Sequence, residues 1–118
     1  MEADNEKFIP QIPQEDLDIL IKKYKEEKNY AECLVLIERN IVIKSQSHGK
    51  GSPEFLKPAQ DLCELCNLIA LSHLENNQAE EGLFYLLRTE RLFKNYKELL
   101  SLCYNNIGCY YKLYYILI

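Results

Sequence analysis

The residues of this chain best suited to chemistry are its five cysteines. Cys63 and Cys66 form the sequence CELC, and zinc sites and redox dithiols both use this spacing. A zinc site needs two further ligands, but Cys103 and Cys109 fall on different sides of any helix that holds both. A redox dithiol usually follows a strand at the start of a helix, whereas this pair lies within a helical pattern. We therefore expect both thiols to pack as small apolar side chains, with zinc binding and redox chemistry as the alternatives.

The other candidates for chemistry are two histidines and one glycine-rich loop. His48 lies in a small polar segment, and His73 takes an inward position of a helical pattern, where we expect a half-buried structural role. The loop HGKGS resembles part of a phosphate-binding loop, but Gly51 separates its lysine from its serine and no strand is expected before it. Paired carboxylates occur only on charged helix faces. The sequence therefore predicts a protein that is not an enzyme and that uses neither a metal nor a cofactor.

Composition narrows the class of protein further. The chain has 118 residues, of which 47% are hydrophobic, and only four glycines and four prolines, a balance that favours helices over a β-sandwich. Its net charge of −4 and its excess of lysine over arginine argue against a nucleic-acid partner. The odd number of cysteines, the lack of a signal-like leader and the lack of a membrane-length apolar run predict a cytoplasmic protein that does not enter a membrane.

About five amphipathic helices are expected to position these residues. Residues 1–14 hold two prolines and few apolar anchors, which predicts an extended N-terminal arm before one helical domain over residues 15–118. Apolar residues at helical spacing predict helices over about 15–27, 30–44, 53–74, 79–93 and from about 99 onward. Short turns between such helices predict antiparallel hairpins.

The widest linker between helices is expected near residues 45–57. It begins with the small and polar stretch SQSHGKGS. Ser52 followed by Pro53 is typical of a helix start, with the serine as N-cap and the proline in the first turn. Two alternatives stay open, since Ser52-Pro53 also fits a proline-directed phosphorylation site and Pro58 permits a later helix start.

A repeated helical pattern runs through the domain. YKEEKNYAECLVLIERN, residues 24–40, resembles the middle of a tetratricopeptide repeat, and similar offsets return in residues 66–82 and in YNNIGCYY, residues 104–111. The resemblance implies an all-α fold of antiparallel helical hairpins, stacked as a short α-solenoid of about two and a half repeats. Small side chains at Gly82 and Gly108 are expected to let helices approach closely. The residues expected to pack the repeats together are Leu20, Ile21, Cys33, Ile69, Ala70, Gly82, Ile107 and Gly108.

The same resemblance implies binding to other proteins, through helical or extended segments. The positions that form a carboxylate clamp in chaperone adaptors hold Asp18, Lys22, Leu68, Leu102 and Asn106, which argues against that variety. We expect a non-enzymatic scaffold or an assembly subunit of a larger complex, by analogy cytoskeletal and associated with microtubules or the ciliary axoneme. The alternative is an adaptor that binds a peptide in its concave groove. The residues expected to meet a partner are Tyr24, His73 and Tyr111 in the groove, and Tyr110, Tyr114, Tyr115, Ile116, Leu117 and Ile118 at an uncovered C-terminal end.

Overall fold

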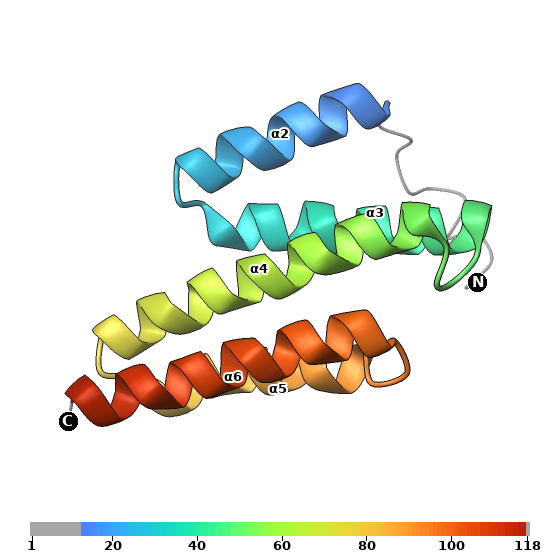
Figure 1. Ribbon diagram of the computed structural model, residues 1–118. Coiled ribbons are helices and arrows are strands. Elements are labelled where there is room, and N and C mark those ends of the chain that lie inside the picture. Colours follow the sequence, from blue (N-terminus) through green and yellow to red (C-terminus); the bar gives the residue numbers. More distant parts are fainter. Residues whose placement is uncertain (1–12, 118) are drawn as a thin grey trace, which may run out of the picture.

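The protein has an all-α fold, and Figure 1 shows consecutive helices running in opposite directions. The structure, a computed structural model, describes residues 13–117. The predicted N-terminal arm therefore lies almost wholly outside the described residues, and so does Ile118. The helices are α2 (Gln14–Glu26), α3 (Tyr30–His48), α4 (Pro53–Glu75), α5 (Ala79–Leu92) and α6 (Lys97–Leu117). The predicted all-α hairpin architecture is confirmed.

Local sequence signals explain where several helices begin and end. Ser52 Oγ accepts a hydrogen bond of 3.2 Å from the Phe55 backbone N–H, so the predicted N-cap of α4 is confirmed. Lys28 and Asn77 adopt left-handed φ angles of 58° and 61°. Because a helix cannot continue through that conformation, these two residues turn the chain from α2 into α3 and from α4 into α5.

The linker between α3 and α4 is shorter than the sequence predicted. Helix α3 continues through the polar residues and α4 begins at Pro53, so only residues 49–52 separate them, in place of the expected 45–57. Ser47 shows why the polar stretch remains helical, since its Oγ donates a hydrogen bond of 2.8 Å to a backbone carbonyl one turn earlier. Pro58 lies inside α4 and does not mark its start.

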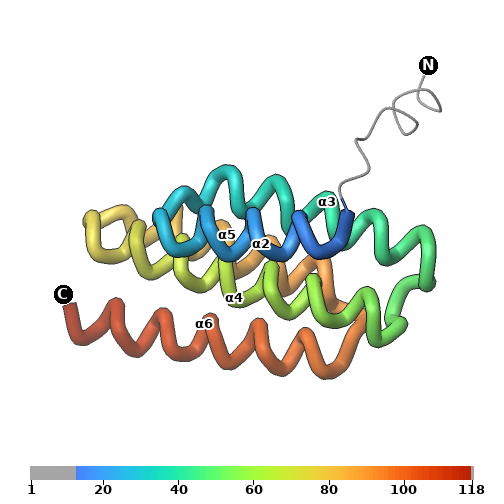
Figure 2. The backbone as a smooth tube through the Cα atoms, turned by 90° about the horizontal axis from the view of Figure 1, so that it is seen from above, coloured from blue at the N-terminus to red at the C-terminus, as the bar shows by residue number. Residues whose placement is uncertain are grey.

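Helix α4 is the centre of the molecule. It packs against α3, α5 and α6. Figure 1 shows it between the α2–α3 hairpin and the α5–α6 pair, and Figure 2 shows α6 beside α4 on the side away from α3. Helix α2, by contrast, packs against α3 alone among the described helices. The hairpins are therefore stacked unevenly, because α4 touches α6 but not α2.

Two apolar clusters hold the helices together, and burial of each large side chain within them contributes about 1.5–3 kcal/mol. Of the residues expected to pack the repeats, Cys33, Ile69, Ala70 and Gly82 are buried, and Leu20, Ile21 and Ile107 are half-buried. The smaller cluster joins α4, α5 and α6 and consists of Ala70, Leu74, Leu86 and Tyr110. The larger cluster consists of Cys33, Ile37, Phe55, Ala59, Leu62, Cys63, Leu65, Cys66, Ile69, Phe93, Leu99 and Cys103.

Apolar spacing predicts an inward stripe of α6 through Leu99, Cys103, Tyr104, Ile107, Gly108 and Tyr111. Leu99 and Cys103 are buried and Ile107 is half-buried, but Tyr104, Gly108 and Tyr111 are exposed. The buried residues of α6 are Leu99, Cys103, Asn106 and Tyr110. Tyr104 is 57% exposed, and a Cβ on Gly108 would meet no heavy atom within 4 Å. The prediction that Gly108 permits a close helix contact is therefore wrong. The reason is steric, since Gly82 on α5 leaves space for the ring of Tyr110, and the stripe of α6 that contains this tyrosine turns inward.

Candidate protein-interaction surfaces

Four of the five cysteines lie inside the core. Cys33, Cys63, Cys66 and Cys103 are buried, and Cys109 is exposed. The CELC thiols thus pack as apolar side chains, as predicted, and Cys103 and Cys109 lie on different sides of α6. Cys63 Sγ is 3.7 Å from Cys103 Sγ, across the contact between α4 and α6. Within residues 13–117, no group of three or more His, Cys, Asp or Glu side chains converges as a metal site would require.

The environment of the buried thiols changes their acidity. Burial raises the pKa of Cys66 to about 12, because the core disfavours the charged thiolate. The hydrogen bond with Cys103, followed by burial, raises the pKa of Cys63. The same hydrogen bond lowers the pKa of Cys103, because it stabilises the charged form of that thiol. Both sulfurs are enclosed by the core, so the pair contributes to the α4–α6 contact and is closed to an external ligand.

His73 takes part in a local contact at the end of α4. Its Nδ1 lies 2.8 Å from Gln78 Oε1, and its ring stacks on Tyr85 with ring centroids 5.7 Å apart. The side chain is half-buried. The structural role expected for this histidine therefore agrees with its surroundings, although one edge of the ring lines a shallow depression with Glu80 and Phe84.

Tyr110 anchors α6 to α5. Its side chain is 2% exposed, and its hydroxyl donates a hydrogen bond of 2.6 Å to the Ala79 backbone carbonyl. Burial raises the pKa of the phenol. The prediction that Tyr110 belongs to an uncovered end is therefore wrong, because the space beside Gly82 encloses its ring.

The last turns of α6 expose most of the other residues expected to meet a partner. Tyr115 is 72% exposed and Ile116 69%, whereas Tyr114 is half-buried against the smaller core cluster. Exposed apolar side chains thus follow one another along these turns with Lys112 as the only charged residue among them. We call this the α6 surface, which consists of Tyr111, Leu113, Tyr115, Ile116 and Leu117.

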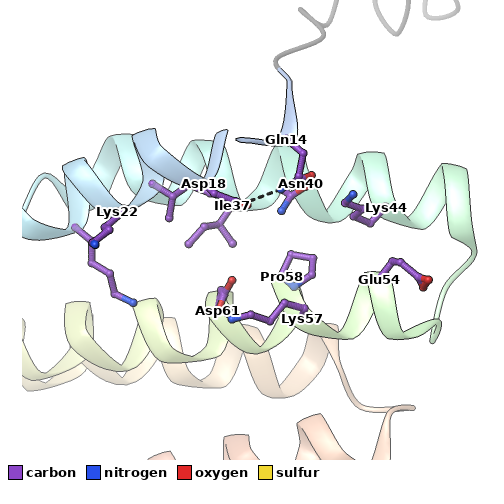
Figure 3. A pocket seen from close by; sticks show the side chains of 12 residues that line it. Gln14, Asp18, Lys22, Ile37, Asn40, Lys44, Glu54, Lys57, Pro58 and Asp61 are labelled. Atoms are coloured by element: carbon purple, nitrogen blue, oxygen red, sulfur yellow. Dashed lines mark hydrogen bonds and ion pairs between the residues drawn. The ribbon is translucent and has the colours of Figure 1, made fainter. Parts of the chain in front are cut away.

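A groove separates α2 from α4, and α3 forms its floor (Figure 3). It has a volume of about 480 Å³. Ile37 and Asn40 of α3 lie at its base, while Ile21 and Pro58 are apolar side chains of its walls. The α2–α4 groove is lined by Gln14, Asp18, Ile21, Lys22, Lys25, Ile37, Asn40, Lys44, Glu54, Lys57, Pro58 and Asp61.

Four lysines stand around the groove. Lys57 of α4 forms an ion pair of 2.8 Å with Asp61, and this carboxylate raises the pKa of the lysine through their hydrogen bond. Lys22 and Lys25 of α2 and Lys44 of α3 form no ion pair with any residue between 13 and 117. The groove is therefore lined by four lysines and three carboxylates, which leaves an excess of one positive charge.

The carboxylates of the groove are largely engaged within it. Asp18 Oδ1 accepts a hydrogen bond of 2.8 Å from Gln14 Nε2, which Figure 3 marks with a dashed line. Asp61 is held by its lysine partner. Glu54 stands at the far end, on the first turn of α4, where the positive end of the helix dipole favours a negative charge.

Asn40 is the polar residue at the base of the groove. It is 6% exposed, and its Oδ1 accepts no hydrogen bond from any described residue. A buried acceptor without a donor costs about 1–3 kcal/mol of folding free energy. The base of the groove thus contains a buried acceptor with no partner among residues 13–117.

The structure does not bring the three residues of the predicted concave groove together. Tyr24 packs from α2 against the larger core cluster. His73 and Tyr111 line separate depressions beside α5. None of the three lines the α2–α4 groove. A groove is present, but between different residues from those the sequence suggested.

Sequence reasoning missed the residues of the α2–α4 groove. Asn40 gave the available signal, since it is a polar residue on the inward stripe of α3, one turn after Ile37. Lys44 follows one turn later on the same side of the helix. The lysines resemble ordinary solvent-facing residues in the sequence, and only the gap between α2 and α4 makes them neighbours.

Comparison of the chain with protein-family models, curated proteins and solved structures finds no match. Between residues 13 and 117, no helix combines the length and apolar character that crossing a bilayer needs. The two surfaces described above are therefore the basis for inferring function.

Proposed function

We propose that this chain is a non-enzymatic protein–protein interaction scaffold that acts as an assembly subunit of a larger complex. The observation that carries the proposal is the α6 surface, where Tyr115 and Ile116 are each more than two-thirds exposed. Single exposed apolar side chains are ordinary on folded proteins, but a contiguous group of them is typical of a binding site. Tyrosines in particular are enriched where protein partners meet.

The occupant that fits the α6 surface is an amphipathic helix of another protein. Tyr111 and Tyr115 lie one helical turn apart on the same side of α6, whereas Leu113 and Leu117 lie about half a turn around the helix from them. Side chains at this spacing form ridges that interdigitate with those of a second helix. Helix α6 already packs in this way against α4 and α5 on its buried side. A partner helix would extend the same mode of packing to its exposed side.

Photo-crosslinking tests this proposal in the complete chain. A photoreactive phenylalanine analogue at position 115 should give a discrete adduct in native cells, and the same analogue at position 19 should not. Ile19 is a matched control because it is 65% exposed on α2. The captured segment, made as a synthetic peptide, should bind the purified protein saturably and become helical on binding.

The double variant Tyr115→Lys/Ile116→Lys should weaken that binding by at least about tenfold, since it places two charges in an apolar contact. Ile19→Lys should leave the affinity unchanged. Both variants change exposed side chains, so their thermal unfolding should match that of the parent chain. Equal adducts at positions 19 and 115, or a captured segment that binds both variants alike, would contradict a helix-binding role for the α6 surface.

A further inference from the structure

We infer that the α2–α4 groove binds an extended acidic segment of another protein, which pairs the backbone N–H and C=O of one residue with Asn40 and directs carboxylates to the lysines of the rim. This site is separate from the α6 surface. The inference goes beyond the proposed scaffold role, because a partner helix on α6 requires nothing of α2 or α3.

Asn40 indicates the kind of group that can bind at the base of the groove. Its buried Oδ1 has no donor among the described residues, and an N–H of a bound segment can supply one. An ionised carboxylate has no proton to donate, whereas every peptide group other than proline has an N–H. The N–H and C=O of one residue in an extended chain belong to two adjacent peptide groups and point to the same side. Such a residue can therefore offer an N–H to Oδ1 and a C=O to the side-chain NH2 of Asn40.

Three lysines that have no ion pair within residues 13–117 specify the charge of the segment. Lys22 and Lys25 face the groove from α2 and Lys44 from α3. Figure 3 shows Lys22 and Lys44 toward opposite ends of the groove, with Asn40 between them. Acidic side chains on either side of the residue bound to Asn40 would thus meet a lysine. The groove has one lysine more than it has carboxylates, whereas the chain as a whole has a net charge of −4. An acidic segment is therefore attracted to the groove more than to the rest of the surface.

The dimensions of the groove favour an extended backbone. Its volume of about 480 Å³ lies in the ordinary range for ligand sites. Helix α2 has 13 residues, which makes it about 20 Å long, and about six residues of extended chain cover that distance. The apolar side chains of Ile21, Ile37 and Pro58 provide contacts for small aliphatic residues placed between the acidic ones. An alternating acidic and aliphatic segment therefore fits best.

Fluorescence anisotropy with three matched probes tests the inference. The first probe is a fluorescein-labelled octapeptide that alternates Asp or Glu with Val, and the other two replace its acidic residues by Asn and Gln or by Lys. Only the acidic probe should bind the full chain saturably, and its affinity should fall as salt is raised. Binding of the neutral probe with equal affinity, or no saturable binding of the acidic one, would overturn the inference.

Variants locate the bound probe. Asn40→Leu should weaken it about tenfold without lowering thermal stability, because the leucine removes both the pairing group and the unpaired acceptor. Lys44→Gln should weaken it by about three- to fivefold, whereas Lys112→Gln, which changes an exposed lysine of α6, should not. Equal losses in the two lysine variants would show general attraction to the surface and overturn the site.

Two further measurements remain decisive even if Asn40→Leu does not fold. The side-chain NH2 resonance of Asn40 in the parent protein should shift on addition of the acidic probe, and the resonances of Tyr115 and Ile116 should not. Inorganic phosphate should displace no more of the probe than a chloride salt does at the same ionic strength. An unmoved Asn40 resonance, or specific displacement by phosphate, would rule out a peptide site at this position.

Discussion

The ring of Tyr110 lies so close to Gly82 that a Cβ on residue 82 would come within 2.5 Å of the tyrosine hydroxyl oxygen. The same Cβ would lie 2.7 Å from the backbone oxygen of Ala70. Helices α4, α5 and α6 therefore meet at one glycine. This contact sets the rotation of α6 about its axis, because only a position that faces Gly82 has room for the ring.

Replacement of Gly82 by alanine should destabilise the fold. The added methyl group meets a backbone oxygen that can move only if α4 moves, and overpacking of this kind costs about 1–3 kcal/mol. The higher helix propensity of alanine stabilises the variant by up to about 1 kcal/mol. We therefore expect the free energy of unfolding to fall by up to about 2 kcal/mol. Urea unfolding followed by circular dichroism measures the difference.

Gly108→Ala is the matched control, since it makes the same change on a helix with no heavy atom within 4 Å of the new Cβ. It should stabilise the protein by up to about 1 kcal/mol. If both alanine variants shift stability in the same direction, the packing described for α5 and α6 is incorrect.

The Tyr110 hydroxyl should contribute measurably to stability. Tyr110→Phe leaves the Ala79 carbonyl without this donor and should cost about 1 kcal/mol in urea unfolding. Tyr115→Phe removes a hydroxyl from an exposed ring and should have no effect. In the Gly82→Ala background, Tyr110→Phe should cost less, because it also removes one atom of the clash. Strict additivity of the two substitutions would argue against direct contact between residues 82 and 110.

The cysteines should divide into one reactive and four protected thiols. Cys109 is exposed, and the other four are buried. With an aromatic disulfide reagent, the native protein should release one equivalent of chromophore rapidly and four more only as fast as it unfolds. Cys109→Ser should abolish the rapid phase. If a thiol still reacts rapidly in that variant, the core that holds the other four cysteines opens far more readily than this packing implies.

Stability should fall as pH rises above 9. Burial raises the pKa of Cys66 from 9.0 to about 12, so the native state keeps this proton through a range in which the unfolded chain releases it. The contribution of Cys66 is complete below pH 9 and is lost between pH 9 and about pH 12, at about 1.4 kcal/mol per pH unit.

Urea unfolding between about pH 8 and pH 11 measures this slope. Cys66→Ala should be less stable than the parent at pH 8 because of the cavity it creates, but its stability should depend less steeply on alkaline pH. Identical slopes for the two proteins would mean that Cys66 ionises as easily in the folded state as in the unfolded chain.

Helix order and approximate bounds could be predicted because they depend on residues that are close in sequence. Apolar spacing located all the described helices, and Ser52 with Pro53 marked the start of α4. The end of α3 was harder to predict, since the polar residues after Ile43 remain helical once their side chains face solvent or bond to the helix backbone. Propensity alone does not distinguish a polar last turn from a loop.

The inward face of α6 could not be chosen from its sequence. Two stripes compete there, one through Tyr104, Gly108 and Tyr111 and one through Leu99, Cys103 and Tyr110, and both contain apolar side chains at helical spacing. The second stripe also includes Asn106, whose side chain bonds to the Cys63 backbone oxygen at 3.5 Å. In the sequence, Asn106 makes this stripe less apolar and so less recognisable as an inward face. Its hydrogen-bond acceptor lies on α4 and is known only from the tertiary structure.

By itself, the sequence determined the all-α class, the succession of helices and the burial of the CELC thiols, because helical periodicity and apolar character are local properties. Only the tertiary structure decided that Tyr110 turns inward against Gly82 and that a groove opens between α2 and α4 above Asn40. These features depend on distances between side chains from different helices. Such distances are set by how side-chain volumes fit when the helices pack, and spacing along one helix does not contain that information.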